Sequence, residues 1–250
     1  MSGHSKWASI KRQKGATDAK RGQLFSKLVR AIIVAARDGG PDPAANLALQ
    51  NAIEKAREAS MPKDNIERAI AKGSGTGTDA AAYETVTYEG YGPGGVALFV
   101  EALTDNRNRT AADVRQAFTK SDGNLGESGS VAWLFERKGV ILMDGAIDED
   151  ELVLAAADAG ADDVETEESS YVVTTAPESL HAVRSALEEA GLAVESAEST
   201  MVPKTSVSIE DEAVARKIVR LMDDLEDNDD VQAVHSNFDI PERVLEAVAG

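Results

Sequence analysis

The residues with the clearest chemical potential lie near the start of the chain, in the segment GHSKWASIKRQK. Four basic residues surround one tryptophan there: Lys6, Trp7, Lys11, Arg12 and Lys14. Lys and Arg side chains can neutralise phosphates, and a Trp ring can stack on a base or anchor the segment to a neighbouring module. The alternative is a solvated tail whose Trp7 packs into a core. Phosphate binding is favoured, because more basic residues follow.

A second polar group spans Thr104 to Thr110, with the sequence TDNRNRT. Its candidate side chains are Asn106, Arg107, Asn108 and Arg109. Placed between a strand and a helix, such amide and guanidinium groups can bind phosphate or hydrogen-bond base edges. In the alternative interpretation, Asp105 or Thr110 caps the helix and the arginines pair with local carboxylates. The residues alone do not separate the two.

A helix must position the basic residues that follow the N-terminal segment. From Asp18 the apolar residues recur at steps of one, three and four, which predicts an amphipathic helix that ends near Gly39-Gly40. At about 100° per residue, one arc opposite the apolar stripe holds a basic set. Its members are Lys20, Lys27, Arg30 and Arg37. We therefore expect a basic face, extended by Arg21, that is offered to a partner.

Two further helices complete a first module. Asp42-Pro43 predicts an N-cap and a first helical residue, with Leu49, Ala52, Ile53 and Ala56 facing inward. A third helix is expected to start at Pro62 and to stop at Gly73. The segment GSGTGTD at residues 73–79 has the composition of a linker.

Beyond the linker the pattern indicates an α+β fold. Strands at 85–89 and 96–104 flank a glycine-rich turn and precede a helix at about 110–119, and 131–136 with 139–143 are read as another strand pair. Residues 140–201 follow the order βαββαβ of a ferredoxin-like unit. The tail adds a strand at 206–209, a helix at 211–225 and a strand at 231–236. We predict an N-terminal three-helix domain and two α+β (ferredoxin-like) domains, one inserted into the other. Their ranges are 1–75, 83–130 with 205–240, and 131–204.

The charge of the chain is distributed unevenly. The 250 residues carry 44 Asp+Glu and 26 Lys+Arg, for a net charge of −18. Residues 1–75 hold 14 basic and 7 acidic residues, net +7, whereas the remainder holds 12 and 37, net −25. Screening limits repulsion of a polyanion by the acidic part to about 8 Å at physiological salt. A basic binding module is therefore compatible with an acidic protein.

Other features argue against catalysis, a cofactor or a metal. The absence of cysteine excludes thiol and Cys-ligated sites. The turn at 90–95 lacks the Gly-Lys-Ser/Thr of a phosphate loop, and the loop at 123–130 is read as mobile. The acidic runs at 148–151 and 223–230 lack calcium-loop spacing and are read as solvated faces. Neither a signal peptide nor a membrane-spanning stretch is indicated, so a cytoplasmic protein is expected.

Several long segments resemble the YebC/PmpR family. They are GHSKWASIKRQKGATDAKRGQLFSKLVRAI, MPKDNIERAIAKG, YEGYGPGGVALFVEALTDNRNRTAADVRQAF and GNLGESGSVAWLF. The resemblance implies the same three-domain fold and places the family's basic and loop motifs on the two groups of residues described first. It further implies a regulator of transcription that binds promoter DNA. The family is also related to a mitochondrial translational activator of cytochrome c oxidase, and its members have been connected to ribosomes stalled on proline-rich sequence.

Two functions therefore lead. The first is a non-enzymatic transcriptional regulator that binds DNA through the basic helical domain. The alternative is a translation factor that binds ribosomal RNA with the same side chains, and composition cannot separate the two. A weaker third hypothesis is an enzyme-like module that senses a small ligand, since ferredoxin-like units often bind one, although fold alone does not establish function.

Overall fold

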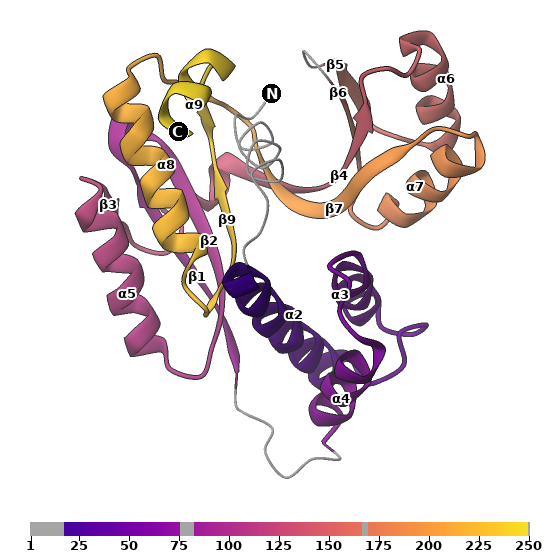
Figure 1. Ribbon diagram of the computed structural model, residues 1–250, viewed down its shortest axis with the longest axis horizontal. Helices are drawn as coiled ribbons and strands as arrows, with labels where there is room; N and C mark the ends of the chain where they lie inside the picture. The colour runs from indigo at the N-terminus through magenta and orange to yellow at the C-terminus, as the bar shows by residue number, and fades with distance from the viewer. Residues whose placement is uncertain (1–17, 76–82, 167–169, 250) are drawn as a thin grey trace. The chain divides into compact units, whose positions relative to one another are not determined.

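The computed structural model describes residues 18–75, 83–166 and 170–249 (Figure 1). Helices come first along the chain, and antiparallel sheets with helices on them follow, so the predicted α+β class is confirmed. The chain divides into two compact units, one over residues 133–206 and the other over the residues on either side of it. The separation of the helical domain from the discontinuous α+β domain stays a prediction.

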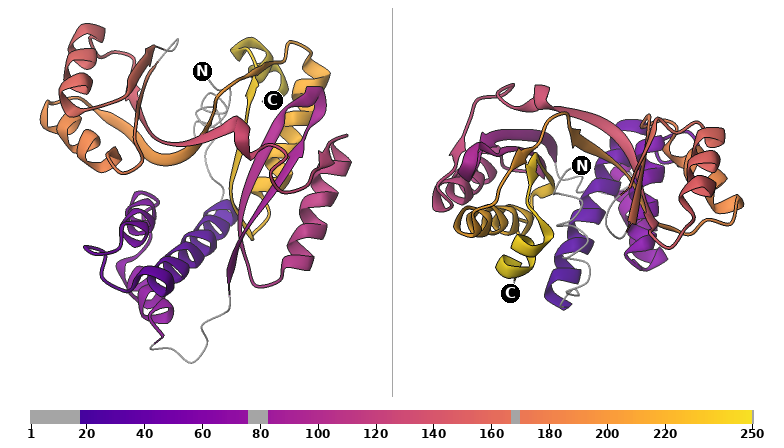
Figure 2. Two further views of the ribbon diagram at one scale, coloured as in Figure 1. Left: turned by 180° about the vertical axis from the view of Figure 1, so that it is seen from behind. Right: turned by 90° about the horizontal axis from the view of Figure 1, so that it is seen from above.

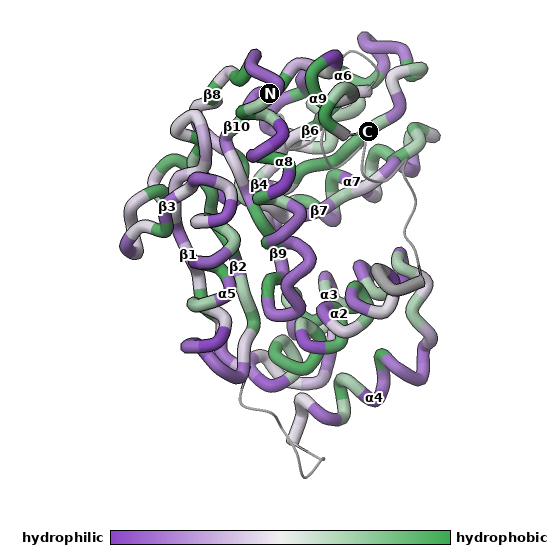
Figure 3. Tube along the Cα trace, turned by 60° about the vertical axis from the view of Figure 1, so that its left-hand side comes forward, coloured by the Kyte–Doolittle hydropathy of each residue, from purple (hydrophilic) through white to green (hydrophobic). Residues whose placement is uncertain are grey.

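Three helices form the first part of the larger unit: α2 (Asp18–Gly39), α3 (Leu47–Glu58) and α4 (Lys63–Gly73). They share one apolar core of aliphatic side chains, which includes Ile32, Leu49 and Ile66. Figure 3 shows hydrophilic and hydrophobic residues alternating along α4, as its one-sided burial requires. The ends predicted for α2 and α4 are confirmed.

The predicted start of the second helix was wrong. Asp42 closes a separate turn, in which its carboxylate accepts from the Ala44 N–H and its carbonyl accepts from the Ala45 N–H. Helix α3 begins four residues later, where the Asn46 side chain accepts from the Leu49 N–H at 3.1 Å. Asn46 also donates to the Ala35 and Gly40 carbonyl oxygens of the preceding helix and its end. This tertiary anchor selects Asn46 over the equally suitable Asp42.

Helices α2 and α4 approach closely at Gly73, which leads to a prediction about packing. A Cβ atom there would lie 2.3 Å from the Ile33 carbonyl oxygen and 2.9 Å from the Ala36 Cβ. Gly73→Ala is therefore expected to lower the free energy of unfolding by about 1–3 kcal/mol, as overpacking does. Urea denaturation followed by circular dichroism measures the change.

Gly22→Ala is the matched control, since nothing lies within 4 Å of a Cβ built at this exposed position of α2. Alanine favours a helix over glycine by about 0.5–1 kcal/mol. The control should therefore be neutral or stabilising. Equal destabilisation by both substitutions would contradict the proposed close contact.

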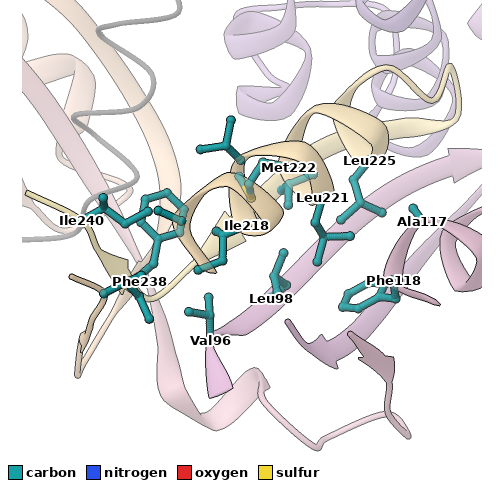
Figure 4. Close-up of a cluster of buried hydrophobic side chains, with 14 of the residues drawn as sticks. Val96, Leu98, Ala117, Phe118, Ile218, Leu221, Met222, Leu225, Phe238 and Ile240 are labelled. Carbon is teal, nitrogen blue, oxygen red and sulfur yellow. The ribbon is translucent and has the colours of Figure 1, made fainter. Parts of the chain in front are cut away.

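A four-stranded antiparallel sheet, in the order β3-β1-β2-β9, forms the rest of this unit. Its strands are β1 (Glu84–Tyr91), β2 (Ala97–Thr104), β3 (Asn124–Leu125) and β9 (Val231–Ser236). Helices α5 (Arg107–Lys120) and α8 (Glu212–Glu226) cover one face. Figure 4 shows Leu98 of β2 gathered with Phe118 of α5 and Leu221 of α8 in the shared core. The predicted pairing of residues before and after the insertion in one sheet is thus confirmed.

The turn between β1 and β2 is a hairpin, as predicted. A short 3-10 turn over Pro93–Gly95 joins the strands, and Gly94 and Gly95 have φ of 73° and 78°. These left-handed angles favour glycine. At the C-terminal end, β8 (Val207–Ser208) pairs in parallel with β10 (Phe238–Asp239). Helix α9 (Glu242–Ala249), which the sequence analysis did not anticipate, buries Val244 and Leu245 in the same core.

The loop that follows β3 is fixed by a buried carboxylate. Glu89 of β1 is 4% exposed, and its two carboxylate oxygens accept from the N–H groups of Gly129, Val131 and Ala132 at 2.7, 2.7 and 2.8 Å. Burial opposes its ionisation, but the three backbone donors outweigh this effect and lower the pKa of Glu89. The loop interpreted as mobile is therefore anchored at its C-terminal half.

Residues 133–206 form the smaller unit, with the ferredoxin-like order βαββαβ that was predicted. Its strands are β4 (Phe135–Asp144), β5 (Asp163–Thr166), β6 (Ser170–Thr175) and β7 (Val194–Pro203), arranged as β5-β6-β4-β7. Helices α6 (Glu149–Ala159) and α7 (Leu180–Glu189) lie on one face of this sheet (Figure 2).

The strand pair predicted at 131–136 and 139–143 was wrong. A 3-10 turn at Ala132–Leu134 leads into the single strand β4, which runs through Arg137 and Lys138. Two adjacent charged residues are typical of a turn, but Arg137 and Lys138 both pair with β7 in a continuous antiparallel ladder. Backbone pairing with a partner strand thus overrides the local polar signal.

Among the residues that the structure describes, no helix has the length and apolar character needed to cross a membrane.

Candidate nucleic-acid interface

Part of the predicted basic surface lies outside the described residues. Lys6, Trp7, Lys11, Arg12 and Lys14 belong to this part. Lys20 lies in the first turn of α2, and its side chain is also outside the description. Arg21 follows it and is exposed to solvent. The structure therefore provides side-chain geometry for Arg21, Lys27, Arg30 and the residues from Asn106 to Arg109.

Lys27 and Arg30 contact an acidic segment of the same chain, at the end of α8. The Lys27 ammonium donates to the Glu226 carbonyl oxygen, and the Arg30 guanidinium donates to the carbonyl oxygen of Asp229. One turn earlier in α2, Gln23 Nε2 donates to the Asp227 carbonyl oxygen at 3.4 Å. Lys27 and Arg30 are thus half-buried, which corrects the prediction that this part of the basic face is open.

The end of α8 explains why cations gather there. The last carbonyl groups of a helix lack intrahelical partners and carry the negative end of its dipole. Carboxylates of the run at 223–230 add further negative charge. The contacts of Gln23, Lys27 and Arg30 all reach this segment, so α2 supplies donors that the end of α8 needs.

Asp230 joins the two basic groups that the sequence analysis treated separately. Its side chain is 6% exposed, and its Oδ1 lies 3.0 Å from Arg30 Nη1 of α2. Its Oδ2 lies 2.7 Å from Arg109 Nη2 of α5 and accepts from the Thr110 hydroxyl at 2.7 Å. The Thr104 hydroxyl lies 3.3 Å from the same oxygen. One carboxylate therefore connects α2, β2, α5 and the start of β9.

The electrostatics of this cluster favour the charged forms. Burial opposes ionisation of Asp230, but hydrogen bonds from Arg109 and Thr110, together with the charges of Arg109 and Arg30, lower its pKa. Hydrogen bonds to Asp230 and to Asp105, the latter at 2.8 Å, raise the pKa of Arg109 above its ordinary value. An ionised carboxylate and two guanidinium groups therefore coexist there.

The polar group at 104–110 is divided between structural and exposed side chains. Asn106 caps α5 by accepting from the Arg109 N–H at 3.1 Å, so neither Asp105 nor Thr110 is the cap, and the helix begins at Arg107. Arg109 has the carboxylate partners foreseen in the alternative interpretation. Asn108 is exposed, and the Arg107 side chain is 64% exposed, with Glu84 Oε2 3.7 Å away.

Arg37, the last basic residue of the predicted stripe, is directed toward the start of the α+β part. It donates to the Tyr83 carbonyl oxygen at 2.6 Å and pairs with its neighbour Asp38 at 2.7 Å. The Arg30 guanidinium carbon lies 5.6 Å from the centre of the Tyr83 ring, within cation–π range. Sequence reasoning missed Tyr83 and Asp230 as partners, although the run at 223–230 was the strongest negative signal available.

No group of three metal-ligating side chains, including those of the 223–230 run, occurs among the described residues. The arrangement around Asp230 binds cationic side chains instead.

Comparisons with known proteins match the chain along nearly its whole length. Residues 5–76 match a family model described as the TACO1/YebC protein N-terminal domain, and residues 83–238 match one described as the TACO1/YebC second and third domain. A protein of Rubrobacter xylanophilus is 59% identical over 251 residues, which cover 100% of both chains. One of Desulfotalea psychrophila is 55% identical over 250 residues, again 100% of both. Each is named a "probable transcriptional regulatory protein".

A solved structure agrees with these matches. The crystal structure of a conserved hypothetical protein from Aquifex aeolicus is 51% identical, superimposes with a TM-score of 0.80, and covers 90% of this chain and 93% of that one. The resemblance inferred from the four sequence segments is therefore confirmed. On the strength of both models and of these full-length relatives, the chain belongs to the TACO1/YebC family.

Proposed function

We propose that the protein is a non-enzymatic transcriptional regulator that binds DNA sequence-selectively through its basic N-terminal domain. The observation that carries the proposal is the charge of the first 37 residues, which hold nine basic residues and one acidic residue. The names of the full-length relatives support a regulatory role. The activity belongs in the cytoplasm, where its polyanionic partner is found.

The proposed surface begins in the N-terminal segment and continues along one face of α2. It comprises Lys6, Trp7, Lys11, Arg12, Lys14, Lys20, Arg21, Lys27 and Arg30. Exposed Arg21 supports an open start of this face, whereas Lys27 and Arg30 are engaged with the acidic segment. Asn106, Arg107, Asn108 and Arg109 form a second contact region in the proposal. Within it, Arg107 and Asn108 have the exposure that a phosphate contact requires, and Asn106 and Arg109 support the start of α5.

Salt dependence tests the DNA proposal directly. Each duplex phosphate contact contributes about −0.9 to the slope of log affinity against log salt. Replacing Lys11, Arg12 and Lys14 with Ala is therefore expected to make the slope shallower by about 2.7 units, because three contacts are lost. Fluorescence anisotropy with a labelled promoter duplex, repeated over a salt series, measures it.

A charge-matched control separates this effect from the net charge of the protein. Arg115, Lys120 and Arg216 are exposed in the α+β part and lie outside the proposed surface. Their triple replacement with Ala should leave the slope unchanged. An unchanged slope in the N-terminal variant, or an equal change in both variants, would refute the proposed site.

The alternative function is translational, with ribosomal RNA as the polyanion. The observation that favours it is the pair of exposed side chains Arg107 and Asn108. They lie outside the helical domain and suit exposed bases and phosphates of structured RNA. Sedimentation of cell extract at low salt distinguishes the two functions. Co-migration with ribosomes that survives DNase treatment would favour translation, and its absence would favour DNA.

A further inference from the structure

We propose that the acidic segment 226–230 is an internal competitor of the polyanion, and that it holds α2 in a closed state that nucleic acid must open. This inference rests on the proposed function and concerns the regulation of the same site. It follows from the contacts of three α2 side chains, Gln23, Lys27 and Arg30, with that segment. We call this set of contacts the clasp.

The clasp occupies the groups that would contact phosphate. Lys27 directs its ammonium to the Glu226 carbonyl oxygen, and Arg30 directs its guanidinium to the Asp230 carboxylate at 3.0 Å and to the Asp229 carbonyl oxygen. The two contacts of Arg30 use the N–H groups of Nη1, and a phosphate that approached the remaining N–H groups would be repelled by the carboxylates of the acidic segment. The closed-state contacts of Lys27 and Arg30 therefore compete with phosphate contacts.

The clasp is polar, which makes it reversible. The apolar core of the helices and that of the α+β part are separate clusters with no member in common. The clasp contacts include hydrogen bonds to three carbonyl oxygens and an ion pair. Such contacts weaken in salt, and another anion can replace them, whereas an apolar interface could not be exchanged in this way.

The α+β part is prepared for release of Arg30. Asp230 retains Arg109 Nη2 and the Thr110 hydroxyl, each at 2.7 Å, when Arg30 departs. Its main chain is also fixed, because its carbonyl oxygen accepts from the Leu103 N–H at 2.8 Å. The carboxylate thus stays ionised and in place, so it remains available to recapture α2. The mobile partner of the clasp is α2, and Asp230 is the fixed one.

A chemical crosslink provides the test, since the chain contains no cysteine. In Gln23→Cys/Asp227→Cys the two thiols stand at positions that the clasp brings together, since the Gln23 side chain reaches the Asp227 carbonyl oxygen, and both positions lie outside the proposed phosphate contacts. A short bis-maleimide joins them, and the control is the same variant with both thiols capped by N-ethylmaleimide. Crosslinking should remove the phosphate contacts of Lys27 and Arg30. The slope of log affinity against log salt then becomes shallower by about 1.8 units, and duplex affinity at physiological salt falls roughly 30-fold.

The outcomes separate the inference from the proposed function. Weaker binding and a shallower slope in the crosslinked form support the clasp. Equal binding by crosslinked and capped forms overturns the clasp and leaves DNA binding intact, as does failure of the crosslink to form within one chain. Absence of duplex binding by the wild-type protein would overturn the proposed function and the inference with it.

A distance measurement tests the proposed opening of the clasp without a crosslink. Asp64→Cys in α4 and Gln116→Cys in α5 place spin labels at exposed positions of the two parts. Saturating duplex DNA should shift the distribution of distances between the labels, as should high salt without DNA. A distribution that stays unchanged with DNA would overturn the proposed opening.

Discussion

Asp230→Ala is expected to lower the free energy of unfolding by about 2–4 kcal/mol. Removing one partner of a buried ion pair costs about 3–5 kcal/mol, because the remaining group loses its partner. We expect a somewhat smaller loss, since the Arg109 side chain is 47% exposed and water can solvate it in the variant. The buried Thr110 hydroxyl also loses its charged acceptor, although the Asn106 carbonyl oxygen at 3.1 Å can still accept from it. Urea denaturation followed by circular dichroism measures the loss.

The neighbouring residue provides a matched control for this prediction. Asp229 is exposed and contributes its carbonyl oxygen, which Asp229→Ala preserves. Its replacement should change the free energy of unfolding by no more than about 0.5 kcal/mol, as surface substitutions do. Equal stability of the two variants would show that Asp230 does not hold the cluster together.

The difference between these two aspartates marks what the sequence could not predict. Both belong to one acidic run, and nothing local distinguishes them. Asp230 is buried because Arg30, Arg109 and Thr110 converge on it from elements distant in the chain. Periodicity, in contrast, is local, which is why α2, α4 and the βαββαβ order of 140–201 were predictable.

The wrong predictions have the same origin. Asp42 and Asn46 are both good caps, and the choice between them depends on the contacts of Asn46 with the preceding helix. Arg37 and Arg30 do lie on the polar side of α2, as helix phase requires. The phase could not tell that the same chain supplies their partners. Which basic side chains remain exposed therefore depends on tertiary contacts, and composition alone overestimates their number.

Glu89→Gln is expected to destabilise the larger unit by about 2–4 kcal/mol at neutral pH, since hydrogen bonds to a charged acceptor contribute about 1.5–3 kcal/mol each. The carboxylate accepts from three backbone N–H groups with two oxygens. An amide has one acceptor oxygen, and its NH2 group would face at least one of these donors. Glu84→Gln on the same strand is the control. Its partner Arg107 is 3.7 Å away and both side chains are about half exposed or more, so little change is expected.

The stabilising effect of ionised Glu89 predicts how the destabilisation by Glu89→Gln changes with pH. The folded-state pKa of Glu89 lies below its ordinary value of 4.5, so ionised Glu89 stabilises the folded state. This contribution is complete above pH 4.5 and is lost as the pH falls through the lower, folded-state pKa. The variant lacks this titrating carboxyl group, so this contribution to its stability does not change with pH. The difference in the free energy of unfolding between wild type and variant should therefore be constant from neutral pH down to about 5 and should shrink below it.

Urea titrations across this range measure the difference in the free energy of unfolding between wild type and variant. A difference that grows toward acid would mean that Glu89 is held protonated in the folded protein.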